Sequence, residues 1–160
     1  MYEQYAADVY NYLFFLSRSK VVTEDMMQET FYRAYLHIEE LQGDKVKPWL
    51  FTVAHRVLID YKRKEKRVTP KEGAYFDLQC SKGELDEQLL VQERLEQTKA
   101  AIHKLPELQK QAIWLIGYYD FTHKEASRIM GVNTNHLRIL LFRARKALRT
   151  MEEDYSEKSV

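Results

Sequence analysis

The apolar residues of this 160-residue chain recur every three or four positions over most of its length. This spacing gathers them on one face of an α-helix, whereas a half-buried strand would need alternation. Only 5 glycines and 3 prolines interrupt the pattern, which is fewer than a turn-rich β-sandwich uses. The sequence therefore predicts an all-α fold.

The helical spacing is lost once, in the middle of the chain. It holds over residues 1–67, disappears in 68–83 and returns over 84–160. The interrupted stretch contains Pro, Gly, Ser and Thr, which is the composition of a linker. We expect two small helical domains joined by this linker, the C-terminal one containing a helix-turn-helix.

Helix starts in the first domain are indicated by capping residues. The second helix is expected to begin at Thr23, because Glu24 and Asp25 then lie in its first turn, where the helix dipole favours negative charge. The third helix is expected to begin at Pro48, since its missing N–H needs no partner there. The predicted core face of the second helix is Met27, Phe31, Ala34, Ile38 and Leu41.

Residues 121–149 have the pattern of a helix-turn-helix, whose second helix enters the major groove of DNA. Thr122 and Glu125 form a capping box, Gly131 suits the turn, and Asn133 can cap the second helix. That helix has no acidic residue up to Arg149. It carries Arg138, Arg143, Arg145, Lys146 and Arg149. Arginine offers a planar fork of donors to phosphate and guanine, although a solvated basic surface on a helical hairpin would show the same charges.

A second basic surface is expected on the helix after Pro48. Arg56, Arg63 and Arg67 are predicted to project away from its apolar face, and Trp49 lies near its start. Cationic side chains that follow the backbone and aromatic rings that stack on bases are typical of single-strand binding. Trp49 is equally compatible with the core.

The net charge of +1, from 25 basic and 24 acidic residues, is a sum over segments of opposite sign. Basic residues gather in 62–71 and 138–149, and acidic residues in 24–29, 84–96 and 152–157. Because screening limits charge effects to about 10 Å at ordinary salt, local charge decides what each surface attracts. The chain is predicted to divide its surface between DNA and protein partners.

Enzyme chemistry is not indicated. The single Cys80 can form neither an internal disulfide nor a thiolate zinc site by itself, and no phosphate-binding loop, nucleophile elbow or His-Glu-x-x-His pattern occurs. We expect no catalytic residue, cofactor, metal or small-molecule substrate. No signal peptide or membrane-spanning run is evident, so a cytoplasmic protein is expected.

Three segments in the same order resemble the extracytoplasmic-function sigma factors, a group of the sigma-70 family of bacterial RNA polymerase. They are residues 24–31, residues 48–61, and residues 105–149 with the sequence Phe-Arg-Ala-Arg-Lys-Ala-Leu-Arg at the end. The resemblance implies a promoter-specificity subunit that binds core RNA polymerase and promoter DNA and assists DNA opening. It also implies an anti-sigma factor as partner, commonly anchored in the membrane.

The resemblance also implies roles for individual residues. Those that would bind core polymerase are Asp25, Gln28, Glu29 and Phe31. Those that would serve minus-ten recognition and melting are Leu41, Gly43, Lys45, Trp49, Arg56, Arg63 and Arg67. Those that would contact the minus-thirty-five element are Asn133, Thr134, Asn135, Arg138, Phe142, Arg143 and Lys146.

Two positions depart from the family pattern. Members usually carry Asn where this chain has Arg56, and often Ser-Arg where it has Ile139 and Leu140. A stand-alone helix-turn-helix regulator that binds duplex operator DNA is the alternative function, but it leaves the surface from Trp49 to Arg67 without a role. A helical enzyme with a DNA-binding tail lacks a catalytic set.

Overall fold

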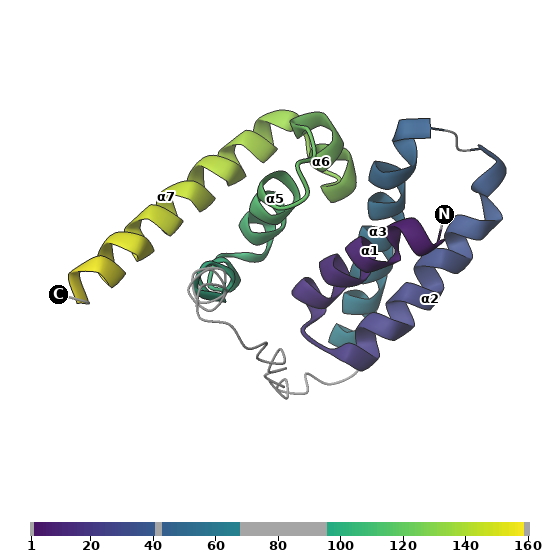
Figure 1. Cartoon of the computed structure of the whole chain (residues 1–160), viewed down its shortest axis with the longest axis horizontal. Coiled ribbons are helices and arrows are strands. Elements are labelled where there is room, and N and C mark those ends of the chain that lie inside the picture. The colour runs from purple at the N-terminus through teal and green to yellow at the C-terminus, as the bar shows by residue number, and fades with distance from the viewer. Residues whose placement is uncertain (1, 41–42, 68–95, 159–160) are drawn as a thin grey trace. The chain divides into compact units, whose positions relative to one another are not determined.

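A computed structural model describes residues 2–40, 43–67 and 96–158 (Figure 1). All regular elements in these ranges are helical, which confirms the predicted all-α fold. The chain divides into two compact units, and α1 to α3 lie in one of them, α5 and α7 in the other. The predicted linker and Leu41 lie outside the described residues.

The N-terminal unit contains three helices, each in contact with the other two. They are α1 (Tyr2–Ser17), α2 (Lys20–Leu36) and α3 (Val46–Arg67), with the short 3-10 turns η1 (Ile38–Glu40) and η2 (Gly43–Lys45) between α2 and α3. Tyr12, Leu50 and Phe51 are fully buried. The rings of Tyr12 and Phe51 lie 5.1 Å apart, so α1 and α3 share one aromatic core.

The start of α2 differs from the prediction. Ser19 is the N-cap, and its hydroxyl accepts a hydrogen bond from the backbone N–H of Val22 at 3.3 Å. Thr23 is completely buried inside the helix, where its hydroxyl donates to the carbonyl oxygen of Ser19 at 2.6 Å. The prediction of Thr23 as the cap is therefore wrong. Arg18 ends α1 in a left-handed conformation, with φ of 57°, and this tight connection fixes the earlier start.

The end of α2 also differs from the prediction. The helix ends at Leu36, and the N–H of His37 turns back to the carbonyl of Ala34 at 3.2 Å. Ile38 then lies in η1 and is exposed, so the predicted apolar stripe stops too late. Helix α3 begins two residues before Pro48, which still places the proline in the first turn, where N–H groups lack helical partners.

The C-terminal unit contains a helical segment at residues 96–103 and the helices α5 (Glu107–Gly117) and α7 (Thr134–Lys158), which pack against each other. Ala112 and Leu115 of α5 are fully buried, as are Leu137 and Ala144 of α7. Figure 1 shows that α7 continues without a break to the end of the described chain. The acidic residues 152–157 therefore extend the same helix that carries the basic run.

The helix-turn-helix forms as predicted, with α6 (His123–Met130) as its first helix. The hydroxyl of Thr122 accepts from the N–H of Glu125 at 3.1 Å, which is one half of the predicted capping box; among the described residues the Glu125 side chain makes no return bond to Thr122. Gly131 has a φ of 69°, and the next N–H, that of Val132, donates to the carbonyl of Ser127 at 3.0 Å. This is the Schellman arrangement that ends a helix. The side-chain oxygen of Asn133 accepts from the N–H of His136 at 2.7 Å and so caps α7.

Replacing Asn133 by Ala is expected to destabilise the start of α7 by about 1 kcal/mol, because an orphan N–H loses its acceptor. Amide hydrogen exchange in the first turn of α7, measured without DNA, tests this. Asn135→Ala is the matched control, since it removes the same side chain from the same exposed turn. It should be neutral or slightly stabilising, because Ala is the better helix former. Equal destabilisation by both variants would rule out the capping role.

Candidate nucleic-acid interface

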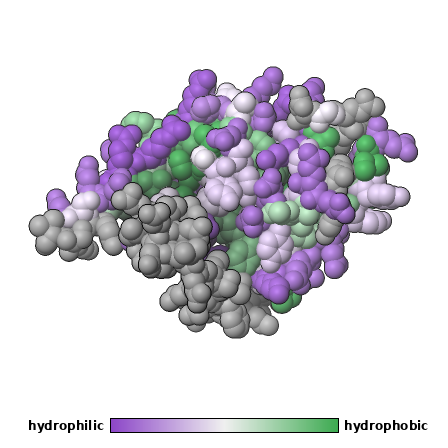
Figure 2. Space-filling model, viewed as in Figure 1, coloured by the Kyte–Doolittle hydropathy of each residue, from purple (hydrophilic) through white to green (hydrophobic). Residues whose placement is uncertain are grey.

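The exposed face of α7 contains all the residues predicted to meet the minus-thirty-five element. The seven exposed side chains are Asn133, Thr134, Asn135, Arg138, Phe142, Arg143 and Lys146. Asn133 caps the helix, and the side chains from Arg138 onward point away from the buried Leu137, Leu141 and Ala144, which hold the helix against its own unit. Hydrophilic side chains, purple in Figure 2, cover much of the visible surface of the protein, with apolar ones, green, between them.

The cations on this face have no carboxylate partner in the part of the chain that the structure describes. Among the described residues, no ion pair uses Arg138, Arg143 or Lys146, although other Arg and Lys side chains do form pairs. The first residues of α7, Thr134 and Asn135, lie at the positive end of the helix dipole, where backbone N–H groups attract phosphate. The arrangement matches a helix that binds the DNA backbone and reads base edges.

The two residues that depart from the family pattern, Ile139 and Leu140, differ in their burial. Leu140 is only 5% exposed and belongs to the core, whereas Ile139 is 48% exposed. Only Ile139 is therefore available to a ligand of the recognition face.

The predicted minus-ten residues are described in part. Arg56 and Arg63 are exposed on α3, and Gly43 and Lys45 are exposed in η2, where Gly43 has a φ of 78°. Trp49 is half-buried, which is compatible with core packing and with base stacking. The side chain of Arg67, like Leu41, lies outside what the structure describes.

The acidic face of α2 presents Asp25, Gln28 and Glu29 to solvent, while Phe31 is half-buried. Sequence reasoning missed the apolar side chains on this helix that are also exposed. They are Val21, Tyr32, Tyr35 and Leu36. Their signal was present in the spacing, because Val21, Asp25, Gln28, Tyr32 and Tyr35 follow one another at steps of four and three.

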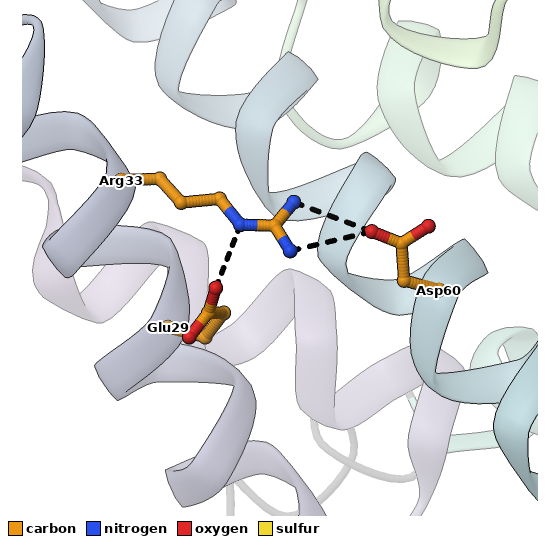
Figure 3. A network of polar contacts seen from close by, with 3 residues as sticks. All are labelled: Glu29, Arg33 and Asp60. Carbon is orange, nitrogen blue, oxygen red and sulfur yellow. Dashed lines mark hydrogen bonds and ion pairs between the residues drawn. The ribbon is translucent and has the colours of Figure 1, made fainter.

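Arg33 links this acidic face to α3, as Figure 3 shows. Its Nε donates to Glu29 Oε1 at 2.8 Å, and both terminal nitrogens donate to Asp60 Oδ2 at 3.3 Å. The hydrogen bond with Glu29, followed by that with Asp60, raises the pKa of Arg33 above its ordinary value, although partial burial opposes the shift. The Arg33 bond therefore favours one orientation of Glu29, whose carboxylate remains exposed.

One polar side chain of α3, His55, is buried inside the N-terminal unit. The hydroxyl of Tyr12 and Nδ1 of His55 are hydrogen-bonded at 3.0 Å in the buried core. Burial raises the pKa of Tyr61, and the charges of Glu65 and Asp25 add to the shift. Helices α2 and α3 pack against each other, so the acidic side chains of α2 and the cations of α3 belong to one helical bundle.

Within the described ranges no three His, Cys, Asp or Glu side chains form a group that could hold a metal ion. None of the helices in those ranges is long and apolar enough to cross a membrane.

Comparison with known proteins decides the family. The model of Sigma-70 region 2 matches residues 1–68, and that of Sigma-70, region 4 matches residues 95–148. The chain is 37% identical over 153 residues to the ECF RNA polymerase sigma factor SigM of Bacillus subtilis (strain 168), covering 94% of this chain and 92% of that protein. The chain belongs to the extracytoplasmic-function sigma factors.

Other relatives agree with this assignment. The ECF RNA polymerase sigma factor EcfG of Rhodopseudomonas palustris (strain TIE-1) is 29% identical, over 80% of this chain and 70% of that protein. The fold resembles that of the sigma factor RpoE in a co-crystal with the anti-sigma factor NepR from Bartonella quintana, with a TM-score of 0.73 at 24% identity, covering 95% and 94% of the two chains. In this sigma factor α1 to α3 fall in region 2, and α5 to α7 fall mainly in region 4. The alternative of a stand-alone helix-turn-helix regulator is not favoured, because it does not account for a region 2.

Proposed function

We propose that this sigma factor binds core RNA polymerase, directs it to specific promoters and assists DNA opening, without catalysing a covalent step itself. One observation carries the proposal: a single chain combines an exposed acidic face in region 2 with an unneutralised cationic helix in region 4. We assign residues 1–67 to the region-2 domain, 68–83 to a linker and 84–160 to the region-4 domain. Polymerase binding and promoter recognition would both take place in the cytoplasm.

The acidic face of α2 is the proposed contact for core polymerase. Asp25, Gln28 and Glu29 are exposed on it, and Phe31 lies half-buried at its edge. Charged groups arranged this way favour encounter with a basic partner surface and fix its register. The bond from Arg33 orients Glu29 before binding, which lowers the entropy lost on docking.

The minus-ten element is proposed to meet η2 and α3. Leu41, Gly43 and Lys45 would lie around a flipped base, and Trp49 would stack on it. The exposed Arg56 and Arg63 would follow the separated strand towards Arg67. Because these groups bind unpaired DNA better than duplex, they shift the melting equilibrium towards the open form.

A protein partner that controls the sigma factor is also proposed. The structurally similar RpoE was crystallised with the anti-sigma factor NepR. A partner of this kind would compete for the acidic face of α2 and for the cationic face of α7, and thereby prevent both polymerase and DNA binding.

Run-off transcription with purified bacterial core polymerase and a panel of promoters tests the proposal. We expect initiation only when this chain is present, from a subset of the promoters. No initiation, together with no binding to core polymerase, would contradict it. Binding of duplex DNA alone, with no effect of polymerase, would instead indicate a repressor or activator.

Arg143→Ala is expected to weaken use of the upstream element by about 1–3 kcal/mol while polymerase binding is unchanged, because a base or phosphate contact of arginine is lost. Initiation rates on promoters with intact and scrambled upstream elements measure the effect. Arg149→Ala is the matched control, as an exposed arginine of the same helix that lies six residues nearer its C-terminal end and just outside the matched region 4. If Arg143→Ala reduced polymerase binding as much as element use, the assignment would be refuted.

A further inference from the structure

Two large apolar side chains are exposed on the cationic face of α7. Ile139 is 48% exposed and Phe142 is 66% exposed. Because they are three positions apart on one helix, they are neighbours on its surface. Adjacent exposed apolar groups within a polar surround are typical of contact sites, so this pair is suited to a partner that presents an apolar group.

The surroundings of the pair indicate what that partner is. Arg138 precedes Ile139, and Arg143 follows Phe142; neither is paired with a carboxylate among the described residues. These cations would hold the helix against the phosphates of DNA. Ile139 is the sixth residue of α7, within the N-terminal part of a recognition helix that contacts base edges.

The chemistry of isoleucine narrows the choice of base. Its side chain has no donor or acceptor, so it cannot bond to the polar groups that distinguish bases in the major groove. The one apolar group that the major groove presents is the C5 methyl of thymine. Leu140, its neighbour in the chain, is buried and cannot contribute.

We propose that Ile139 is a specificity-determining residue that contacts the C5 methyl of a thymine in the minus-thirty-five element, which is the upstream element of the promoter. Phe142, one helical turn further along, packs against the same methyl group. The inference rests on the proposed function and adds one detail to it: thymine is the base that Ile139 recognises.

The experiment begins with promoters selected from randomised DNA by core polymerase with the full-length sigma factor. Each thymine on either strand of the recovered upstream element is then replaced by deoxyuridine, which lacks only the methyl group. We expect one thymine at which the wild-type enzyme initiates about fourfold more slowly on the uracil promoter. A factor of about four corresponds to the free energy of burying a single methyl group. Ile139→Ser should lose most of this difference between the two promoters, because only Phe142 remains beside the methyl group, and Ile139→Val should retain it.

The ratio of the two initiation rates makes the test independent of overall activity. Leu108→Ser is the matched control, because Leu108 is an exposed apolar residue of α5 in the same unit, and it should keep the wild-type ratio. An upstream element without thymine, a wild-type ratio of one at every position, or an unchanged ratio in Ile139→Ser each overturns the inference. Loss of polymerase binding or of anti-sigma binding in Ile139→Ser, with the ratio unchanged, would assign the pair to a protein partner.

Failure of the inference and failure of the proposed function give different results. If initiation depends on the upstream element but does not distinguish thymine from uracil, only the inference is overturned. If no selected promoter supports initiation and polymerase is not bound, the proposed function is overturned and the inference with it.

Discussion

Reversing two charges on α2, with Asp25→Lys and Glu29→Lys together, is expected to reduce the affinity for core polymerase by at least about 100-fold. Both carboxylates are exposed on the proposed docking face. The replacement puts two cations against the basic surface proposed for the partner. Such a like-charge contact costs several kcal/mol, and each step of about 1.4 kcal/mol lowers the affinity by a factor of ten. Equilibrium binding of labelled sigma factor to core polymerase measures the change.

The fold should tolerate this double variant. Glu29 pairs with Arg33 at 2.8 Å, but both side chains are partly exposed, and a pair of this kind contributes at most about 1 kcal/mol. Arg33 keeps its second partner, Asp60. Circular dichroism should therefore be unchanged, which separates loss of docking from loss of structure.

A second charge reversal provides the matched control. Glu153→Lys with Asp154→Lys makes the same change in net charge at exposed positions of α7, outside the matched region 4. Its affinity for core polymerase should stay within about threefold of wild type, the scale of a remote surface effect. An unchanged affinity in the α2 variant, or an equal loss in both variants, would show that the α2 face is merely solvated.

Local signals in the sequence were sufficient to predict most of the fold. Thr122, Gly131 and Asn133 each act through atoms within five residues, and all three take the predicted conformation or hydrogen bond. The start of α2 was mispredicted although its signal is also local, because Ser19 and Thr23 are both acceptable caps. The turn that Arg18 makes at the end of α1 decided between them, and a positive φ at an arginine has no sequence signature.

The candidate site was predictable where its residues share one helix. The exposed face of α7 follows from helical spacing alone. The stripe of Leu137, Leu141 and Ala144 also made it possible to infer that Ile139 is exposed and Leu140 is buried. The bond between Arg33 and Asp60 could not, because 27 positions separate them and the packing angle of α2 on α3 brings them together. The near-zero net charge was uninformative for a different reason: it sums segments of opposite sign, which are separate already in the sequence.

Phe51→Ala is expected to destabilise the N-terminal unit by about 3–5 kcal/mol, the second large effect. The Phe51 side chain is completely buried, and its ring lies 5.1 Å from that of Tyr12, tilted by 52°. Removing the ring leaves a cavity that the three helices can close only in part. The adjacent bond from Tyr12 to His55 would lose the packing that excludes water from it. Amide hydrogen exchange, followed residue by residue, measures the change in α1 to α3.

Residue-by-residue exchange is required because a chain of two compact units need not unfold in one step. Phe142→Ala is the matched control: it removes the same side chain from an exposed position and should change stability by less than about 0.5 kcal/mol. The two variants should have opposite functional profiles as well, since Phe142→Ala weakens use of the upstream element while Phe51→Ala lowers the amount of folded region 2. Equal stability losses would mean that Phe51 is not part of the core that holds α1 against α3.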